Sequence, residues 1–374
     1  MTITREGLAG RIRHLREQEG LTQHQLAERV SSLDQPKISK IETGERGVSS
    51  LELVDLAAAL GIHPGDLLDD RPIGEFVGMA ARSGTYRERS TVEHAIARTE
   101  AAVRLHRTLA RLGYGTAAAP AVDPPAAVKG SPGTQGKTLA AWVRSELGLG
   151  DDPIDDLIGL AEEGFGLNLL IDHFGDGFDG LCVHDDGFAL GVVNSAAPAS
   201  RQRFTIAHEL CHHIVNDLQD GLHVDESLFS TGGDPSEVRA NAFAAYLLMP
   251  PGGVRDVVGQ PFRVEMAARL QYQFGASLQS VAFHLRNLGL IDDRWREQLR
   301  ATPVFQLAEM AGCRAQYEAD DGERRRLVLP ARLQRLALDA FVAGDLGVSP
   351  VAELRGESDQ EFGAWAEENL GVGR

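Results

Sequence analysis

Residues 203–217, RFTIAHELCHHIVND, form the stretch that decides the fold of the larger part of this chain. The segment contains no Pro or Gly and its apolar residues recur at helical spacing, so it predicts a buried helix. His208 and His212 are four residues apart and lie on one side of that helix, where two imidazoles can bind one metal ion. Glu209 lies beside them and can accept a proton from water acidified by zinc. The pattern predicts peptide hydrolysis at a zinc centre.

A second apolar helix is predicted over residues 236–250 and carries a candidate third ligand, Glu237, near its start. Zinc hydrolases commonly keep three protein ligands and leave one position open, so a set of two His and one Glu is chemically complete. The longer zincin pattern needs Gly at position 215 and His at position 218. This chain has Val215 and Leu218 there, which excludes that pattern.

Four other side chains compete for the role of third ligand: His213, Asp217, His223 and Asp225. His213 points about 100° away from His212 around the same helix. His223 and Asp225 are expected in a polar loop with nothing to fix them. These alternatives stay open at the level of the sequence.

The two motifs together resemble the ImmA/IrrE family of metallopeptidases. HELCHH at 208–213 is followed by E-x-x-A-N-x-F-A-A-x-L-L-M-P at 237–250, after strand-like segments at 167–171 and 190–194. The match covers roughly residues 137–300. The resemblance implies an α+β zincin-like domain with a small sheet. In that domain the zinc ligands are His208, His212 and Glu237, and the general base is Glu209. Asn241 is a candidate for contacting one of the zinc-binding side chains rather than the zinc itself.

One position departs from the family pattern. The residue before the second ligand is usually Gly, and this chain has Cys211. We interpret Cys211 as a small apolar filler, with a redox-responsive thiol as the lesser alternative. The strand at 190–194 is expected to be a sheet edge on which a substrate peptide docks as an added strand.

The first 70 residues carry a second signature. Helices are predicted at 8–16, 22–30, 35–42, 51–60 and 64–68, with Asp34 as the cap before Pro36 in the third helix. This unit resembles the XRE/Cro-like helix-turn-helix domain over residues 6–70, most clearly in LTQHQLAERV and ISKIETGER. The resemblance implies a five-helix DNA-binding domain.

In such a domain the third helix enters the major groove and its first residues meet base edges. The candidates for DNA contact are Gln35, Lys37 and Lys40, with Gln23 at the start of the second helix. The turn before the third helix is one residue longer than usual in the family, so which of Gln35 and Lys37 faces a base stays open. The alternative is that these are solvated side chains of a small helical bundle.

Charge separates the two halves of the chain. Residues 1–136 contain 17 basic and 17 acidic side chains, so the whole net charge of −17 falls on residues 137–374. An acidic half is repelled by a DNA backbone, and we therefore assign DNA contact to the N-terminal domain. Three widely spaced Cys, no apolar signal core and no membrane-spanning run lead us to expect a cytoplasmic protein without membrane attachment.

The predicted organisation is multi-domain and mainly α. A helix-turn-helix domain at 1–70 is followed by a connector helix and flexible linker at 71–136, the peptidase domain at 137–300 and a helical C-terminal region at 301–374. The connector helix, at about 90–112, opens on a capping box and has an apolar stripe interrupted by Thr99. It is expected to pack on either domain, or on a second copy as a homodimer.

These features predict a zinc-dependent metallo-endopeptidase coupled to a DNA-binding domain in transcriptional regulation. The family resemblance implies that the substrate is a helix-turn-helix repressor, whose cleavage relieves repression after stress or mobile-element induction. One alternative is a transcription factor or antitoxin whose peptidase fold senses a ligand or partner with little proteolysis. Another is an N-terminal domain that recognises the repressor instead of DNA.

Overall fold

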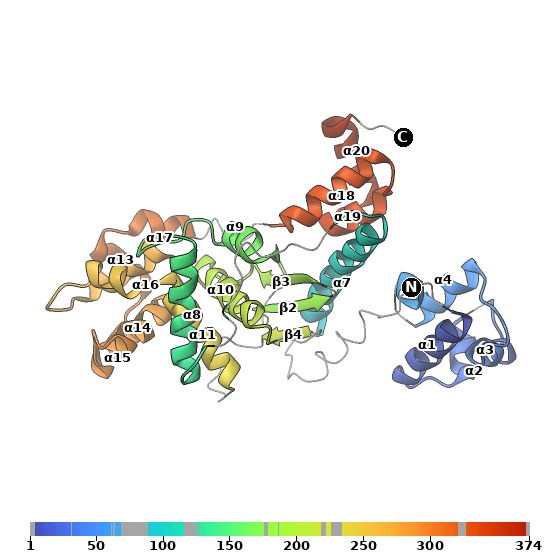
Figure 1. Ribbon diagram of the computed structural model, residues 1–374, viewed down its shortest axis with the longest axis horizontal. Helices are drawn as coiled ribbons and strands as arrows, with labels where there is room; N and C mark the ends of the chain where they lie inside the picture. Colours follow the sequence, from blue (N-terminus) through green and yellow to red (C-terminus); the bar gives the residue numbers. More distant parts are fainter. Residues whose placement is uncertain are drawn as a thin grey trace. The chain divides into compact units, whose positions relative to one another are not determined.

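A computed structural model describes residues 4–30, 32–60, 62, 64–68, 89–115, 125, 128–175, 179–185, 187–217, 222–225, 234–320 and 327–371. The chain divides into two compact units, residues 1–83 and 84–374, which we call the N-terminal and C-terminal units. Both are mainly helical, and the C-terminal unit contains a small sheet (Figure 1). The predicted fold class is confirmed. No helix in the described parts of the chain has the length and apolarity needed to cross a membrane.

The N-terminal unit has the five predicted helices. They are α1 (Arg5–Gln18), α2 (Gln23–Arg29), α3 (Gln35–Glu42), α4 (Ser50–Ala59) and α5 (Pro64–Leu68). Asp34 caps α3 by accepting from the Lys37 amide, as expected from the sequence, and a Thr22–Gln25 capping box starts α2. One face of each helix supplies fully buried apolar side chains such as Ile12, Leu26, Ile38, Leu56 and Leu67. The caps fix where the helices begin, and this shared core holds them together.

A buried ion pair crosses the N-terminal unit. Nε of Arg16 donates to Oε1 of Glu42 at 2.6 Å, and Nη2 donates to Oε2 at 3.0 Å. Gln23 donates to the same Oε2 at 2.9 Å. The hydrogen bonds to Glu42 raise the pKa of Arg16 even though burial lowers it. Both charges are therefore compensated inside the unit.

The sheet of the C-terminal unit has the strand order β1-β3-β2-β4. Its strands are β1 (Leu167–Asp172), β2 (Gly180–Asp185), β3 (Phe188–Asn194) and β4 (Leu222–Asp225). β3 is parallel to β1 and antiparallel to β2, and β4 is antiparallel to β2. The expectation that the strand at 190–194 is a substrate-binding edge is wrong, because β3 is paired on both sides. All seven of its residues are buried, which fits its continuous apolar run.

The helices of the C-terminal unit include α7 (Arg89–Arg111), α8 (Pro132–Glu146), α9 (Leu157–Gly159), η1 (Leu160–Gly164), α10 (Ala199–Val215), α11 (Pro235–Leu248), α12 (Pro251–Val257), α13 (Val264–Phe274), α14 (Leu278–Asn287), α15 (Asp293–Ala301), α16 (Val304–Ala311), α17 (Arg314–Asp320), α18 (Ala331–Ala343), α19 (Val348–Arg355) and α20 (Asp359–Leu370). The helices predicted at 203–217 and 236–250 are present as α10 and α11. α8 begins inside the stretch expected to be a linker to residue 136, and most of 116–127 lies outside the described residues.

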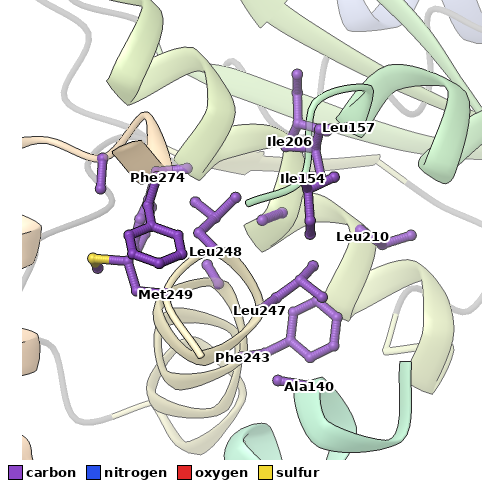
Figure 2. Close-up of a cluster of buried hydrophobic side chains, with 14 of the residues drawn as sticks. Ala140, Ile154, Leu157, Ile206, Leu210, Phe243, Leu247, Leu248, Met249 and Phe274 are labelled. Carbon is purple, nitrogen blue, oxygen red and sulfur yellow. The ribbon is translucent and has the colours of Figure 1, made fainter. Parts of the chain in front are cut away.

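α10 and α11 lie side by side and share an apolar core with α8. Figure 2 shows Leu210 of α10 and Phe243 and Leu247 of α11 pointing into this core beside Ala140 of α8. Gly136 allows α8 to approach α11 closely, because a Cβ there would lie 2.2 Å from the Arg239 carbonyl oxygen. This packing fixes the position of α11 relative to α10, on which the site described below depends.

α7 packs within the C-terminal unit, against β3 and the helices α18 and α19 (Figure 1). Arg98 is 7% exposed, donates to Asp172 of β1 at 2.8 Å and to the Glu353 and Leu354 carbonyls at the end of α19. Thr99, which interrupts the apolar stripe, is buried and bonds back to the Ala95 carbonyl at 2.7 Å. The helix expected as a connector is thus part of the core of this unit.

Candidate metal centre and DNA-contacting helix

α10 places two imidazoles together in the interior. His208 and His212 are 0% and 1% exposed, and their Nε2 atoms lie 3.1 Å apart. The helix ends at Asn216 in a left-handed conformation with φ 52°, which turns the chain back after the second His. The predicted geometry of two His on one side of a helix is therefore present.

α11 brings Glu237 to the same point. Asp234 caps this helix and Pro235 occupies its first turn, so Glu237 lies in that turn. Its Oε2 is 3.3 Å from Nε2 of His208 and its Oε1 is 3.4 Å from Nε2 of His212. Among the described residues, these three form the group whose ligand atoms all lie within 4.8 Å of one another. Two ligands held about 2.0–2.1 Å from a tetrahedral zinc lie roughly 3.3 Å apart, so this donor set fits zinc.

Hydrogen bonds on the opposite edges of the two imidazoles fix their orientation. Nδ1 of His208 lies 3.2 Å from Oδ1 of Asn241, so Asn241 contacts a candidate zinc-binding side chain, as expected. Nδ1 of His212 faces Oδ2 of Asp217 at 3.1 Å, and Arg239 also donates to that oxygen. Burial lowers the pKa of His212, but hydrogen bonds to Asp217 and Glu237 outweigh it and raise the pKa to about 9. Asp217 therefore supports His212 from behind.

This supporting role of Asp217 was missed from the sequence, where it was only a competitor for the third ligand. The sequence signal is Asn216 directly before it, since Asn is one of the residue types that tolerate the left-handed conformation observed here at the helix end. Burial raises the pKa of Asp217, but the hydrogen bonds to His212 and Arg239 lower it by more. The pKa is therefore below its usual value. The carboxylate is thus held ionised against the imidazole.

Glu209 is fully buried beside the sheet. A Cβ on Gly180 of β2 would lie in ordinary van der Waals contact with Oε1 of Glu209, at 3.8 Å, so β2 passes directly beside the carboxylate. Glu209 is also one of the charges that raise the pKa of His212, after the larger contributions named above. The predicted general base therefore lies close to the ligand cluster.

Of the remaining competitors, the side chain of His213 is bonded away from the cluster. His213 lies with Nε2 2.8 Å from the Phe165 carbonyl and Nδ1 3.2 Å from His184, and burial lowers its pKa. His223 and Asp225 belong to β4 rather than to the polar loop expected, because pairing with β2 orders this short segment. The structure therefore groups Glu237, and not His213, with the two His.

Cys211 lies between the two candidate His ligands in the sequence, and its side chain is part of the core. It is 0% exposed, and burial raises its pKa to about 12. A thiol with that pKa is almost fully protonated at neutral pH and reacts slowly with oxidants. These properties favour the interpretation of Cys211 as an apolar filler.

In the N-terminal unit, three of the predicted DNA-contacting residues are exposed on α3: Gln35, Lys37 and Lys40. Gln23 is half-buried at the start of α2, where it donates to Glu42 and accepts from Gln35 at 3.1 Å. Gln23 therefore links the buried ion pair to the start of α3. The three α3 side chains face solvent, where Gln35 is bonded to Gln23 and Lys37 lies 3.9 Å from Asp34.

Two parts of the sequence match known protein families. Residues 8–70 match the helix-turn-helix domain, and residues 189–286 match the IrrE N-terminal-like domain. The chain thus carries an XRE-like helix-turn-helix domain followed by an ImmA/IrrE-like domain, and the resemblance inferred from the sequence is confirmed.

A search of curated proteins found no match. Among solved structures, PlcR of Bacillus thuringiensis in complex with the peptide PapR7 and DNA is 13% identical, with 84% of this chain and 98% of that chain covered and a TM-score of 0.20. ComR from Streptococcus suis is 12% identical, with 100% and 96% covered and a TM-score of 0.18. Likeness at these TM-scores carries no argument about fold or function.

Proposed function

We propose that this chain, which joins a helix-turn-helix domain to an ImmA/IrrE-like domain, is a zinc-dependent peptidase that acts in transcriptional control. The observation that carries the proposal is the convergence of His208, His212 and Glu237 from two helices, with ligand atoms within 4.8 Å of one another. Asn241 and Asp217 hold the two imidazoles from behind, as supporting residues do at zinc sites.

The residues divide the chemistry among themselves. Bound zinc supplies a Lewis acid that polarises a carbonyl and acidifies water. Glu209 accepts the proton from the attacking water and returns it to the leaving amine. Glu209 is 0% exposed, so its carboxylate is shielded from bulk solvent. Asp217 and Asn241 keep the His nitrogens aimed at the metal position.

The substrate we propose is a DNA-binding repressor of the helix-turn-helix class, as the family resemblance implies. Charge supports this choice, because residues 137–374 carry the entire net charge of −17 and attract a basic protein. The exposed residues of α3 would bring the chain to the regulated promoter through DNA. Cleavage of the repressor there would relieve repression.

A second candidate is a regulator whose peptidase-like unit senses a ligand and cleaves little. Burial favours it, since His208 and Glu209 are both 0% exposed while Glu237 has 17% of its side chain exposed. In this case zinc would have a structural role and derepression would follow from binding alone.

The substitution Glu209→Gln separates the two candidates, because it keeps the shape of the side chain and removes the base. The wild type and the variant are expressed with a repressor encoded beside the gene, and cleavage, bound zinc and reporter output are measured. We expect zinc to stay bound and cleavage to fall by about 100-fold or more, since general-base catalysis contributes on that order. Derepression without cleavage in both proteins would overturn the peptidase proposal and favour the sensor.

A further inference from the structure

Arg239 lies next to the candidate metal centre and joins three parts of the C-terminal unit. It belongs to α11, two residues after the candidate ligand Glu237, and its side chain is 15% exposed. One end of its guanidinium, Nη2, donates to Oδ2 of Asp217 in the segment that follows α10. The other end, Nη1, donates to Oε1 of Gln135 on α8 at 3.2 Å. The planar guanidinium is therefore held at both ends.

Gln135 is itself fixed by the chain that enters α8. Its Nε2 donates to the Gly130 carbonyl at 3.1 Å, just before the helix begins. This bond turns the amide nitrogen toward Gly130 and the amide oxygen toward Arg239. At the next residue, Gly136, α8 also approaches the Arg239 backbone closely. The start of α8 thus holds the guanidinium in one position.

Asp217 is the most exposed of the groups that contact His212. Its side chain is 25% exposed, whereas that of His212 is 1% exposed, so water can compete for the carboxylate. Asp217 also lies outside α10, which ends in the left-handed Asn216. Its Oδ2 accepts from Arg239 and lies 3.1 Å from Nδ1 of His212. The bond from Arg239 therefore fixes the same oxygen that faces the imidazole.

We propose that Arg239 is a positioning residue for the zinc ligand His212, acting through Asp217, and that it couples zinc affinity to the start of α8. This inference rests on the function proposed above, because it requires zinc at His208, His212 and Glu237. Asp217 accepts the hydrogen on Nδ1 of His212, which leaves Nε2 without a hydrogen and able to bind the metal. Arg239 keeps the carboxylate in the orientation that maintains this tautomer.

The charge of Arg239 alone would affect zinc binding in the opposite direction. Glu209, Glu237 and Asp217 supply three carboxylates to a site that zinc enters with two positive charges. Arg239 adds a further positive charge, which repels the metal ion. Its removal should therefore strengthen zinc binding if Arg239 acts only through its charge. Positioning predicts weaker binding, so the sign of the change separates the two roles.

The test measures the zinc affinity of the metal-free full chain by competition with a chromophoric chelator, a readout that needs no substrate. Arg239→Met keeps most of the length of the side chain and removes its hydrogen bonds. We expect zinc binding to weaken about tenfold, at the lower end of the effect of supporting residues at zinc sites. Arg239→Lys keeps the charge and a donor for Asp217, and should recover part of this loss. Gln135→Ala removes only the outer bond and should weaken zinc binding about threefold.

A double-variant cycle tests whether Arg239 acts through Asp217. Asp217→Ala should weaken zinc binding by about 10–100-fold. In that background Arg239→Met should cause no further loss, because the carboxylate that Arg239 orients is gone. Independent roles would instead multiply the two losses. Multiplied losses would overturn the proposed route through Asp217.

Arg203→Met is the matched control. Arg203 is half-buried like Arg239, lies on α10 and donates to the Ile154 carbonyl at 2.6 Å. Its replacement should leave zinc affinity near the wild-type value. A loss equal to that of Arg239→Met would show a general effect of removing a half-buried Arg and overturn the proposal.

Unchanged or stronger zinc binding in Arg239→Met would also overturn the positioning role. If Arg239→Met does not fold, Arg239→Lys and Gln135→Ala decide, since both keep the positive charge. Weaker zinc binding in these two variants supports the role, and unchanged binding overturns it. Absence of zinc binding in the wild type would overturn the function proposed above together with this inference, so the two failures are distinguishable.

Discussion

Both units bury charged or ionisable side chains, but in opposite arrangements. In the N-terminal unit, Arg16 and Glu42 are hydrogen-bonded to each other, so the pair is complete within the fold. In the C-terminal unit, His208, His212 and Glu237 direct their ligand atoms to one shared point. A buried polar group whose hydrogen bonds are all made within the protein stabilises one arrangement of the fold. Polar groups that direct their ligand atoms to one point instead indicate a binding site, here for a metal ion.

The largest effect on stability is expected when the Arg16–Glu42 ion pair is broken. Glu42→Leu leaves the buried Arg16 with only the exposed Glu17 as a counter-charge and should destabilise the N-terminal unit by about 3–5 kcal/mol. Hydrogen exchange in α1 to α5 should accelerate while exchange in the C-terminal unit is unchanged. The double variant Arg16→Leu, Glu42→Leu is the control, since removal of both charges should restore much of the stability. Normal exchange in Glu42→Leu would show that the pair contributes little.

The convergent cluster is tested by comparing Glu237→Ala with His213→Ala. The first removes a proposed ligand and should weaken zinc binding by about 100-fold or more, beyond the loss that an outer hydrogen bond causes. The second removes a His that is bonded to the Phe165 carbonyl and should leave zinc affinity near the wild-type value. Metal analysis after dialysis against a zinc buffer measures both. Similar losses in the two variants would contradict the assignment of Glu237.

His284 is a third kind of buried polar group, with one nitrogen bonded and one not. Its pKa is lowered by burial to about 4, below the unfolded value of about 6.5, so the unfolded chain binds the proton more tightly. Its contribution to stability is present above pH 6.5 and is lost as pH falls toward 4, by about 3 kcal/mol in all. His284→Gln, which cannot titrate, should show a correspondingly smaller loss between pH 7 and pH 4 in urea unfolding. Identical pH profiles of stability in the wild type and His284→Gln would contradict the assignment of this loss to His284.

The smallest effect on the fold is expected on the exposed surface of α3. Lys37→Ala should change the stability of the N-terminal unit by less than about 0.5 kcal/mol. If Lys37 contacts a phosphate, the slope of log affinity against log salt should fall by about one in a mobility-shift series on the gene's upstream DNA. Arg13→Ala, an exposed cation on α1, is the control for a general charge effect. Equal changes in both variants would favour a non-specific role.

The helices were predictable because their signals are local. Asp34 before Pro36, the Thr22–Gln25 box and the apolar spacing through residues 203–217 each act within a few residues of the element they define. The grouping of His208 with His212 follows from helical spacing alone. The third ligand needed the approach of a second helix, so the sequence could name Glu237 only as one candidate among several.

The sheet was predicted less well, because pairing is not local. β2, with the sequence GLCVHD, and β4, with LHVD, have little strand character of their own and exist through their shared ladder. The apolar run of β3 indicated burial correctly, but its neighbours on both sides were not visible in the sequence. Asp217 was missed as a partner of His212 for the same reason, since its role depends on the chain turning back at Asn216.

The bond from Arg98 of α7 to the end of α19 spans 255 residues of sequence. At synthesis rates of about 5–20 residues per second, α7 leaves the ribosome roughly 10–50 s before that part of α19 exists. During this interval the side of α7 that packs against α18 and α19 in the finished fold lacks those helices. The C-terminal unit can therefore complete its packing only when almost the whole chain has been synthesised.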